Sequence, residues 1–323
     1  MFAKFANHHK SSNMNYQANF IGLKNKLERT ILLCLAVATT ISLSSASALA
    51  KDPFRDKNPR DIGKHTEQAF KTIFLEGDYQ AVVEKLEQAE SQEPQEPLAH
   101  AMLASLAYTE KDWESIKKYA LQTLETARVL SQSDPVRGNL YLAVGHFLDG
   151  AYIYKKQGAI DAIDKLQLVF KYLDRAEAAD ASDPELNLIK GYIDLFLAVN
   201  LPFSKPEQAI ARFEGYAAPN YLVERGLAVA YRDLKEYDRA LKYADKALET
   251  APKNPEHYYL KGQILRQIGK KENNPQILTE AVENFELALA KSAQLPNFVL
   301  KTLRKENRLT KEKIAEIELN KQN

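Results

Sequence analysis

YLVERGLAVAYRDLKEYDRALKYADKALETAPKN, residues 221–254, is the stretch of sequence that decides the fold. Apolar or small residues recur at helical spacing from Leu222 to Leu234 and again from Ala240 to Leu248. A short polar turn separates the two runs, and Pro252 ends the second one. A hairpin of two such helices cannot bury its apolar faces by itself, so it must stack on further hairpins. We therefore expect an all-α fold made of stacked helical hairpins.

The same stretch resembles the tetratricopeptide repeat, a helix–turn–helix unit of about 34 residues. With Tyr221 as position 1, the family's small and apolar positions 7, 8, 11, 20, 24, 27 and 32 are filled by Leu227, Ala228, Tyr231, Ala240, Ala244, Ala247 and Pro252. Repeats of this family stack into a superhelix whose inner wall is lined by the first helix of each hairpin. The resemblance therefore implies a superhelical solenoid that binds proteins or peptides, and it leaves the ligand open.

Further copies of the unit precede and follow the reference stretch. Tyr79 and Trp113 lie one repeat apart, as do Asp78 and Asp112, and such self-similarity at a fixed period indicates a repeat protein. A polar last helix suits the cap that ends a solenoid. We expect about six helix–turn–helix units over residues 63–96, 97–130, 134–183, 184–220, 221–254 and 255–295, followed by a polar C-terminal capping helix and tail over 296–323.

The first fifty residues are typical of an export signal. Lys24, Lys26 and Arg29 precede an apolar run over residues 31–43, and Ala48-Leu49-Ala50 offers small residues for cleavage before Lys51. The apolar run is shorter than the roughly 20 residues of a membrane span. We expect a signal peptide over 1–50 and a flexible lead over 51–62. The mature protein would lie in the periplasm or an equivalent extracytoplasmic lumen. A retained N-terminal anchor and a true start at Met14 stay open.

Composition limits the class of partner. The chain has 44 Lys and Arg against 43 Asp and Glu, and without residues 1–50 the balance is 39 against 42. This balance gives no support to a nucleic-acid partner. Cys34 is the only cysteine, and it lies in the expected signal, so the processed chain would contain no thiol and no disulfide. We expect no stable membrane insertion once the signal is removed.

No catalytic motif is present in the sequence. H-E-x-x-H, a phosphate-binding glycine loop and Cys/His metal spacing are all missing. His146 and Asp149 lie three residues apart on one expected helix and could share a proton or a metal, or form an ordinary solvated pair. The basic cluster around Lys301 and Arg304 contains interleaved glutamates, which favours a solvated helix face over a contact for an acidic partner or lipid headgroup. We predict no enzyme activity and no cofactor.

The resemblance assigns ligand contacts to set positions on the first helix of each hairpin. It implies an apolar, aromatic middle followed by a half that carries arginines, which would suit an apolar peptide flanked by acidic groups. For Tyr192 and Phe196 a core role is an equal alternative, and for the arginines so is pairing with Asp233, Glu224 or Glu256. The expected groove residues are Tyr108, His146, Asp149, Tyr192, Phe196, Arg225, Arg232, Tyr259, Gln263 and Arg266.

Three functions fit this architecture. The first is a non-catalytic exported scaffold that binds a protein or peptide in its concave groove and helps to assemble or hold an envelope or membrane complex. The second is a structural or oligomerisation module that uses the convex face or the inserted loops near Asn200 and Lys270. The third is an enzyme or sugar-binding repeat protein. The first is the prediction carried forward.

Overall fold

The computed structural model describes residues 52–200 and 206–322, and the secondary structure among these residues is helical, with no strand. The expected all-α repeat of helical hairpins with a C-terminal helix is thereby confirmed. None of the described helices is both long enough and apolar enough to span a membrane. The expected signal peptide, its cleavage site and Met14 lie outside the described residues.

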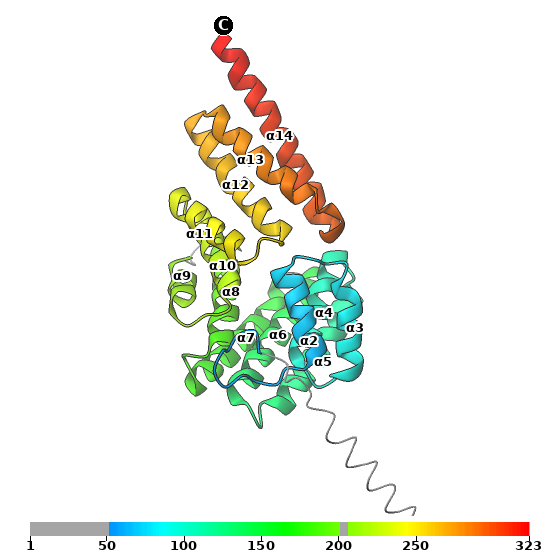
Figure 1. Ribbon diagram of the computed structural model, residues 1–323. Helices are drawn as coiled ribbons and strands as arrows, with labels where there is room; N and C mark the ends of the chain where they lie inside the picture. The colour runs from blue at the N-terminus through cyan, green and yellow to red at the C-terminus, as the bar shows by residue number, and fades with distance from the viewer. Residues whose placement is uncertain (1–51, 201–205, 323) are drawn as a thin grey trace, which may run out of the picture. The chain divides into compact units, whose positions relative to one another are not determined.

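Consecutive helices pair as antiparallel hairpins along the chain (Figure 1). A π-helical turn, η1 (Lys71–Leu75), extends α2, and a 3-10 turn, η2 (Ser292–Gln294), precedes the last helix. The helices are α2 (Lys64–Phe70), α3 (Val82–Gln92), α4 (Pro97–Glu110), α5 (Trp113–Leu130), α6 (Pro135–Gln157), α7 (Ala159–Ala179), α8 (Pro184–Asn200), α9 (Pro206–Gly215), α10 (Asn220–Asp233), α11 (Tyr237–Thr250), α12 (Pro255–Glu272), α13 (Pro275–Leu289) and α14 (Asn297–Gln322).

Capping residues set where the first helix of several hairpins begins. Glu96, Asp134 and Asn254 each accept a hydrogen bond from a main-chain N–H in the first turn of α4, α6 and α12, and a proline follows each of them. Asp183 does the same for α8, accepting from the N–H of Leu186 at 2.8 Å. A cap with proline at the first helical position satisfies a free donor and fixes the helix start.

Small residues allow neighbouring helices to approach closely, both within a hairpin and between one hairpin and the next. A methyl group added at Gly145 would lie 2.7 Å from Leu124, and one added at Gly262 would lie 2.6 Å from the ring of Phe285. Ala240 is fully buried where α11 packs on α10. Gly145 and Gly262 hold position 8 of their repeats, and Ala240 holds position 20. Small side chains at these positions allow short distances between helix axes.

Residues 52–62, here called the N-terminal strap, are packed against the helices rather than free. The sequence predicted a flexible lead in this region, and the structure corrects that prediction for the described residues. Phe54 is 3% exposed and Ile62 is 1% exposed. The two carboxylate oxygens of Asp52 accept hydrogen bonds from the N–H groups of Phe54 and Arg60 at 2.9 and 3.1 Å, which folds the strap on itself.

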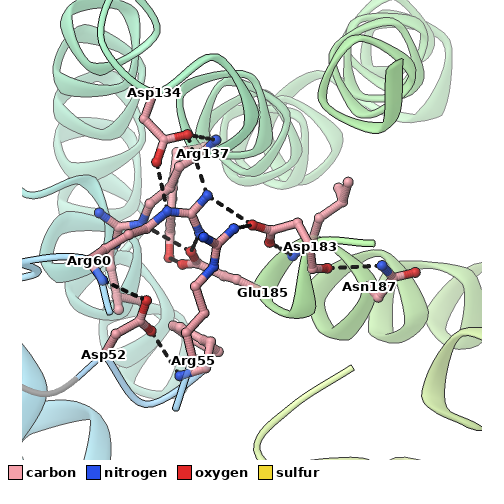
Figure 2. Close-up of polar contacts among 12 residues, drawn as sticks. Asp52, Arg55, Arg60, Asp134, Arg137, Asp183, Glu185 and Asn187 are labelled. Carbon is pink, nitrogen blue, oxygen red and sulfur yellow. Dashed lines mark hydrogen bonds and ion pairs between the residues drawn. The ribbon is translucent and has the colours of Figure 1, made fainter. Parts of the chain in front are cut away.

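Arginines fasten the strap to the starts of the hairpins (Figure 2). The guanidinium of Arg60 lies 2.7 Å from Asp134, 2.8 Å from Asp183 and 3.3 Å from Glu185, and Arg55 also pairs with Asp183. Buried Arg137 contacts both oxygens of Glu96, at 2.9 and 2.6 Å, and Glu185 at 3.0 Å. Asp134 and Asp183 are the caps of α6 and α8, so the strap joins the first ends of two hairpins directly, and Arg137 of α6 links Glu96, the cap of α4, to Glu185.

The first hairpin also contacts the sixth. The main-chain N–H of Tyr79 donates to the carbonyl of Gln294 at 2.9 Å, and its hydroxyl donates to Glu256 at 3.2 Å. The side-chain amide of Asn254 donates to the carbonyl of Phe74 at 3.1 Å. Residues more than 170 positions apart are therefore joined, and the inner surfaces of the intervening helices enclose a space.

Candidate ligand-binding cavity

A cavity of about 590 Å³ lies among the first helices of the hairpins. Its lining is buried near the starts of these helices, at Leu98 and Leu188, and exposed near their ends, at Tyr108 (55%) and Phe196 (50%). The cavity therefore has a closed inner end and a mouth. The lining residues are Phe54, Phe70, Phe74, Tyr79, Leu98, Ser105, Tyr108, Ile116, Val144, Phe147, Leu148, Ala151, Leu188, Ile189, Tyr192, Ile193, Phe196, Leu222, Arg225, Asn254 and Glu256.

Aromatic side chains close the inner end. Phe54 of the strap packs edge-on against Phe70 of α2 with ring centroids 5.0 Å apart, and Phe70 contacts Phe74 at 4.7 Å. All three line the cavity. Sequence reasoning missed them because Phe54 stands in a polar, proline-containing segment. A single aromatic residue in such a segment was the only signal available.

A small polar group lies in the wall where the first and sixth hairpins meet. The guanidinium of Arg225 lies 3.8 Å from the carboxylate of Glu256, which also accepts the hydroxyl hydrogen bond of Tyr79. Burial raises the pKa of Tyr79, and the neighbouring Glu256 raises it further. Burial alone would lower the pKa of Arg225, but Glu256 and the tyrosines keep it above its ordinary value. At neutral pH this group contains a neutral tyrosine and a charged arginine, each in contact with Glu256.

Four of the ten residues expected in the groove line this cavity: Tyr108, Tyr192, Phe196 and Arg225. The ring of Phe196 packs edge-on against Phe147 at 5.4 Å beside the mouth. The hydroxyl of Tyr192 donates to the carbonyl of Leu222 at 2.7 Å, and its ring contacts Phe213 of α9. Tyr192 therefore belongs to the packed interior and to the cavity wall at once.

His146 and Asp149 face α7 instead of the cavity. The imidazole of His146 stacks on the ring of Tyr172 with centroids 5.4 Å apart, and Asp149 pairs with Lys165 at 2.7 Å. Burial and the charge of Lys165 lower the pKa of His146, so its imidazole is neutral at pH 7. Each residue of the pair is thus engaged by the second helix of its own hairpin.

The remaining four residues lie where α12 meets its neighbours, on a stretch that α14 partly covers. Arg232 pairs with Asp233 at 2.9 Å and donates to Gln263 at 2.9 Å, and Gln263 donates to Glu306 of α14 at 3.0 Å. The ring of Tyr259 contacts Phe285 at 5.9 Å. Arg266 is partly buried, and its Nε has no hydrogen-bond partner among the described residues.

A second, more open groove of about 820 Å³ runs between the first two hairpins and the segment before α14. Val83 of α3 and Leu106 of α4 form one side, and residues 292–297 with Leu300 form the other. Tyr79 lines both this groove and the cavity, so the contact between the first and sixth hairpins separates the two spaces.

A family model matches part of the chain that forms these hairpins. Residues 204–255 and 225–288 match the family model of the tetratricopeptide repeat. A structure similar to this chain is that of a thermophilic TPR protein from Thermus thermophilus, with 20% identity and a TM-score of 0.44 over 63% of this chain and 98% of that one. No curated protein sequence matches the chain. Repeats of this family generally mediate contacts between proteins and are typically non-catalytic.

Proposed function

We propose that the chain is an exported, non-catalytic scaffold that binds a protein partner at the mouth of the inner cavity. The observation that carries this proposal is an aromatic rim, Tyr108, Phe147 and Phe196, around an apolar interior. Aromatic side chains supply much of the binding energy at protein interfaces. A partner segment that lies across the rim would insert one or two apolar side chains. Such a scaffold would hold or help assemble an envelope or membrane complex.

The partner's acidic groups, expected from the sequence, would be met at Arg225. Of the three arginines expected in the groove, only Arg225 lines the cavity. Arg232 is engaged by Asp233 and Gln263 instead. The ion pair between Arg225 and Glu256 is long, at 3.8 Å, so a carboxylate of the partner could compete for the guanidinium. Arg225→Gln should then weaken binding, and added salt should weaken it in the wild type.

Export is the part of the proposal that rests on residues 1–50 alone. A charged segment, an apolar run and an Ala-Leu-Ala site follow one another in the order of a secretory signal. Fusing residues 1–60 to a reporter that is active only after export tests this part. An inactive reporter on a full-length cytoplasmic product would refute it.

Site-specific photo-crosslinking tests the binding site. The photoreactive amino acid p-benzoylphenylalanine is placed at Phe196 on the rim, or at Val129, an exposed residue of α5 outside the cavity. We expect one protein adduct from position 196 in living cells and none from position 129. Adding Ala151→Trp, which fills the cavity, should remove the adduct. An adduct that persists in the filled variant would show that the partner binds elsewhere.

A second candidate function is oligomerisation through α7. Ile160, Ile163 and Phe170 are 83%, 51% and 41% exposed. Their spacing of three and seven residues places them on one face of the helix. An exposed apolar face of this kind marks interaction surfaces. Sedimentation of the wild type and of Ile160→Glu/Ile163→Glu separates this candidate from the first, because only a self-associating chain would become smaller.

A further inference from the structure

The polar side chains of the inner cavity are already paired within the chain. The hydroxyl of Tyr79 donates to Glu256, and those of Tyr192 and Ser105 donate to main-chain carbonyls at 2.7 and 2.9 Å. The amide of Asn254 donates to one main-chain carbonyl and its oxygen accepts from one main-chain N–H. Arg225 and Glu256 pair with each other at 3.8 Å in the cavity wall, so apart from this one ion pair the inner cavity offers an occupant mainly apolar contact.

This pairing decides between two kinds of occupant. A polypeptide carries an N–H and a carbonyl at almost every residue, and each of these groups that is buried without a partner loses its hydrogen bond to water. A hydrocarbon chain has no such groups and gains free energy from every methylene that leaves water. The volume of about 590 Å³ exceeds that of one inserted side chain and falls within the range of small-molecule pockets. The depth of the cavity thus suits a hydrocarbon chain.

Lysines stand beside the mouth. Lys155 lies one helical turn after Ala151 of the cavity wall, and its ammonium is 5.6 Å from the ring of Trp113, which itself packs edge-on against Tyr108. Lys111 follows the end of α4, three residues after Tyr108. Both are exposed, whereas the neighbouring Lys156 pairs with Glu114 at 3.2 Å. An anionic group at the mouth would meet these two charges.

We infer that the cavity binds a single-chain amphiphile tail first, with its hydrocarbon chain between Phe54 and Phe196 and its anionic head at Lys155 and Lys111. This inference goes beyond the proposed function, because its ligand is a lipid and not a protein. A free fatty acid and a lysophospholipid share the required chemistry. The strap is part of the site, since Phe54 closes its inner end.

Titration calorimetry of the full, delipidated chain with palmitate tests the inference. We expect saturable binding, weakened at least tenfold by Ala151→Trp, which places an indole in the cavity. The matched control Val129→Trp puts the same side chain on the exposed surface of α5 and should leave binding unchanged. Equal palmitate affinity in the wild type and Ala151→Trp, or no binding to the wild type, would overturn the inference.

The head group is tested with a separate variant. This variant also keeps the inference testable if Ala151→Trp fails to fold. Lys111→Glu/Lys155→Glu should weaken the affinity for palmitate at least fivefold. The affinity for hexadecanol, which has the same chain length and no charge, should stay within twofold of the wild-type value. A palmitate affinity that is unchanged in this variant would overturn the head-group assignment. Palmitoyl lysophosphatidylglycerol is titrated in parallel, and the tighter of the two anionic ligands identifies the natural source. If neither binds while the crosslink at Phe196 still forms, the lipid inference fails and the protein scaffold stands.

Discussion

His257 illustrates how the fold uses a titratable group for packing. It is fully buried in α12, and its Nδ1 lies 2.9 Å from the carbonyl of Ala247 in the preceding helix. Burial, reinforced by the charge of Arg225, lowers the pKa of His257 from 6.5 to about 4. The neutral ring can donate the hydrogen bond that fastens α12 to α11, and protonation would place an extra charge beside a guanidinium.

This shift gives a pH prediction. Between pH 6.5 and 4 the unfolded chain binds a proton at His257 that the folded chain does not, so this contribution to stability is complete above pH 6.5 and is lost as the pH falls. The loss amounts to about 3 kcal/mol over the whole window. In urea denaturation, His257→Gln should therefore lose less stability than the wild type between pH 7 and pH 4.5. An identical pH dependence would show that His257 titrates normally in the fold.

Arg137 gives a second prediction for a single side chain. Burial alone would lower its pKa, but Glu185 and Glu96 hold it well above its ordinary value, so it is charged. Arg137→Met would leave buried Glu96 without its ion-pair partner and Glu185 with only the more distant Arg60, which should lower the free energy of unfolding by about 3–5 kcal/mol. Arg308→Met, which breaks an exposed pair with Glu312 on α14, should cost at most about 1 kcal/mol. Equal effects on chemical denaturation would contradict this account.

Among helices, the close contact of α10 and α11 is set by small residues. Ala240→Leu adds three heavy atoms where Ala240 is fully buried, and overpacking of this kind should destabilise the chain by about 1–3 kcal/mol. Lys242→Leu, on the exposed side of the same helix, is the control and should change stability by no more than about 0.5 kcal/mol. Thermal melts of both variants provide the measurement. An unchanged Ala240→Leu would mean that the repeat register is misassigned.

The strap behaves as a structural element although it has no helix or strand. Phe54→Ala should remove about 3–5 kcal/mol of stability, because a buried ring is deleted between Phe70 and the cavity. Phe298→Ala removes an exposed ring from α14 and serves as the matched control. If both variants melted at the same temperature, the strap would be free in solution, as the sequence suggested.

Helix pairing could be predicted from the sequence because it depends on local patterns. Apolar spacing identified α10 and α11, and the repeat period placed the units over 134–183 and 184–220, whose first helices are α6 and α8. The order of the strap could not be predicted in this way. Its polar residues are typical of a loop, and they are held by carboxylates more than 70 residues away. Only the folded arrangement brings these charges together.

At the scale of the whole molecule, the cavity depends on how the rotation of each hairpin relative to the next accumulates along the chain. Tyr108, Tyr192, Phe196 and Arg225 share one cavity because hairpins one to six curve until Tyr79 reaches Glu256. No repeat pattern encodes this contact. Nor could the bond between Gln263 and Glu306 of the last helix be predicted, because it joins two polar side chains that the apolar spacing of neither helix marks.

The most direct test of the central claim, that the inner cavity is the binding site for a partner, is the affinity of the crosslinked protein partner for Ala151→Trp, measured by calorimetry. The account predicts binding at least tenfold weaker than in the wild type, with helix content and melting temperature retained and with Val129→Trp unchanged. Wild-type affinity in the Ala151→Trp variant would contradict the claim and move the binding site to another surface of the solenoid.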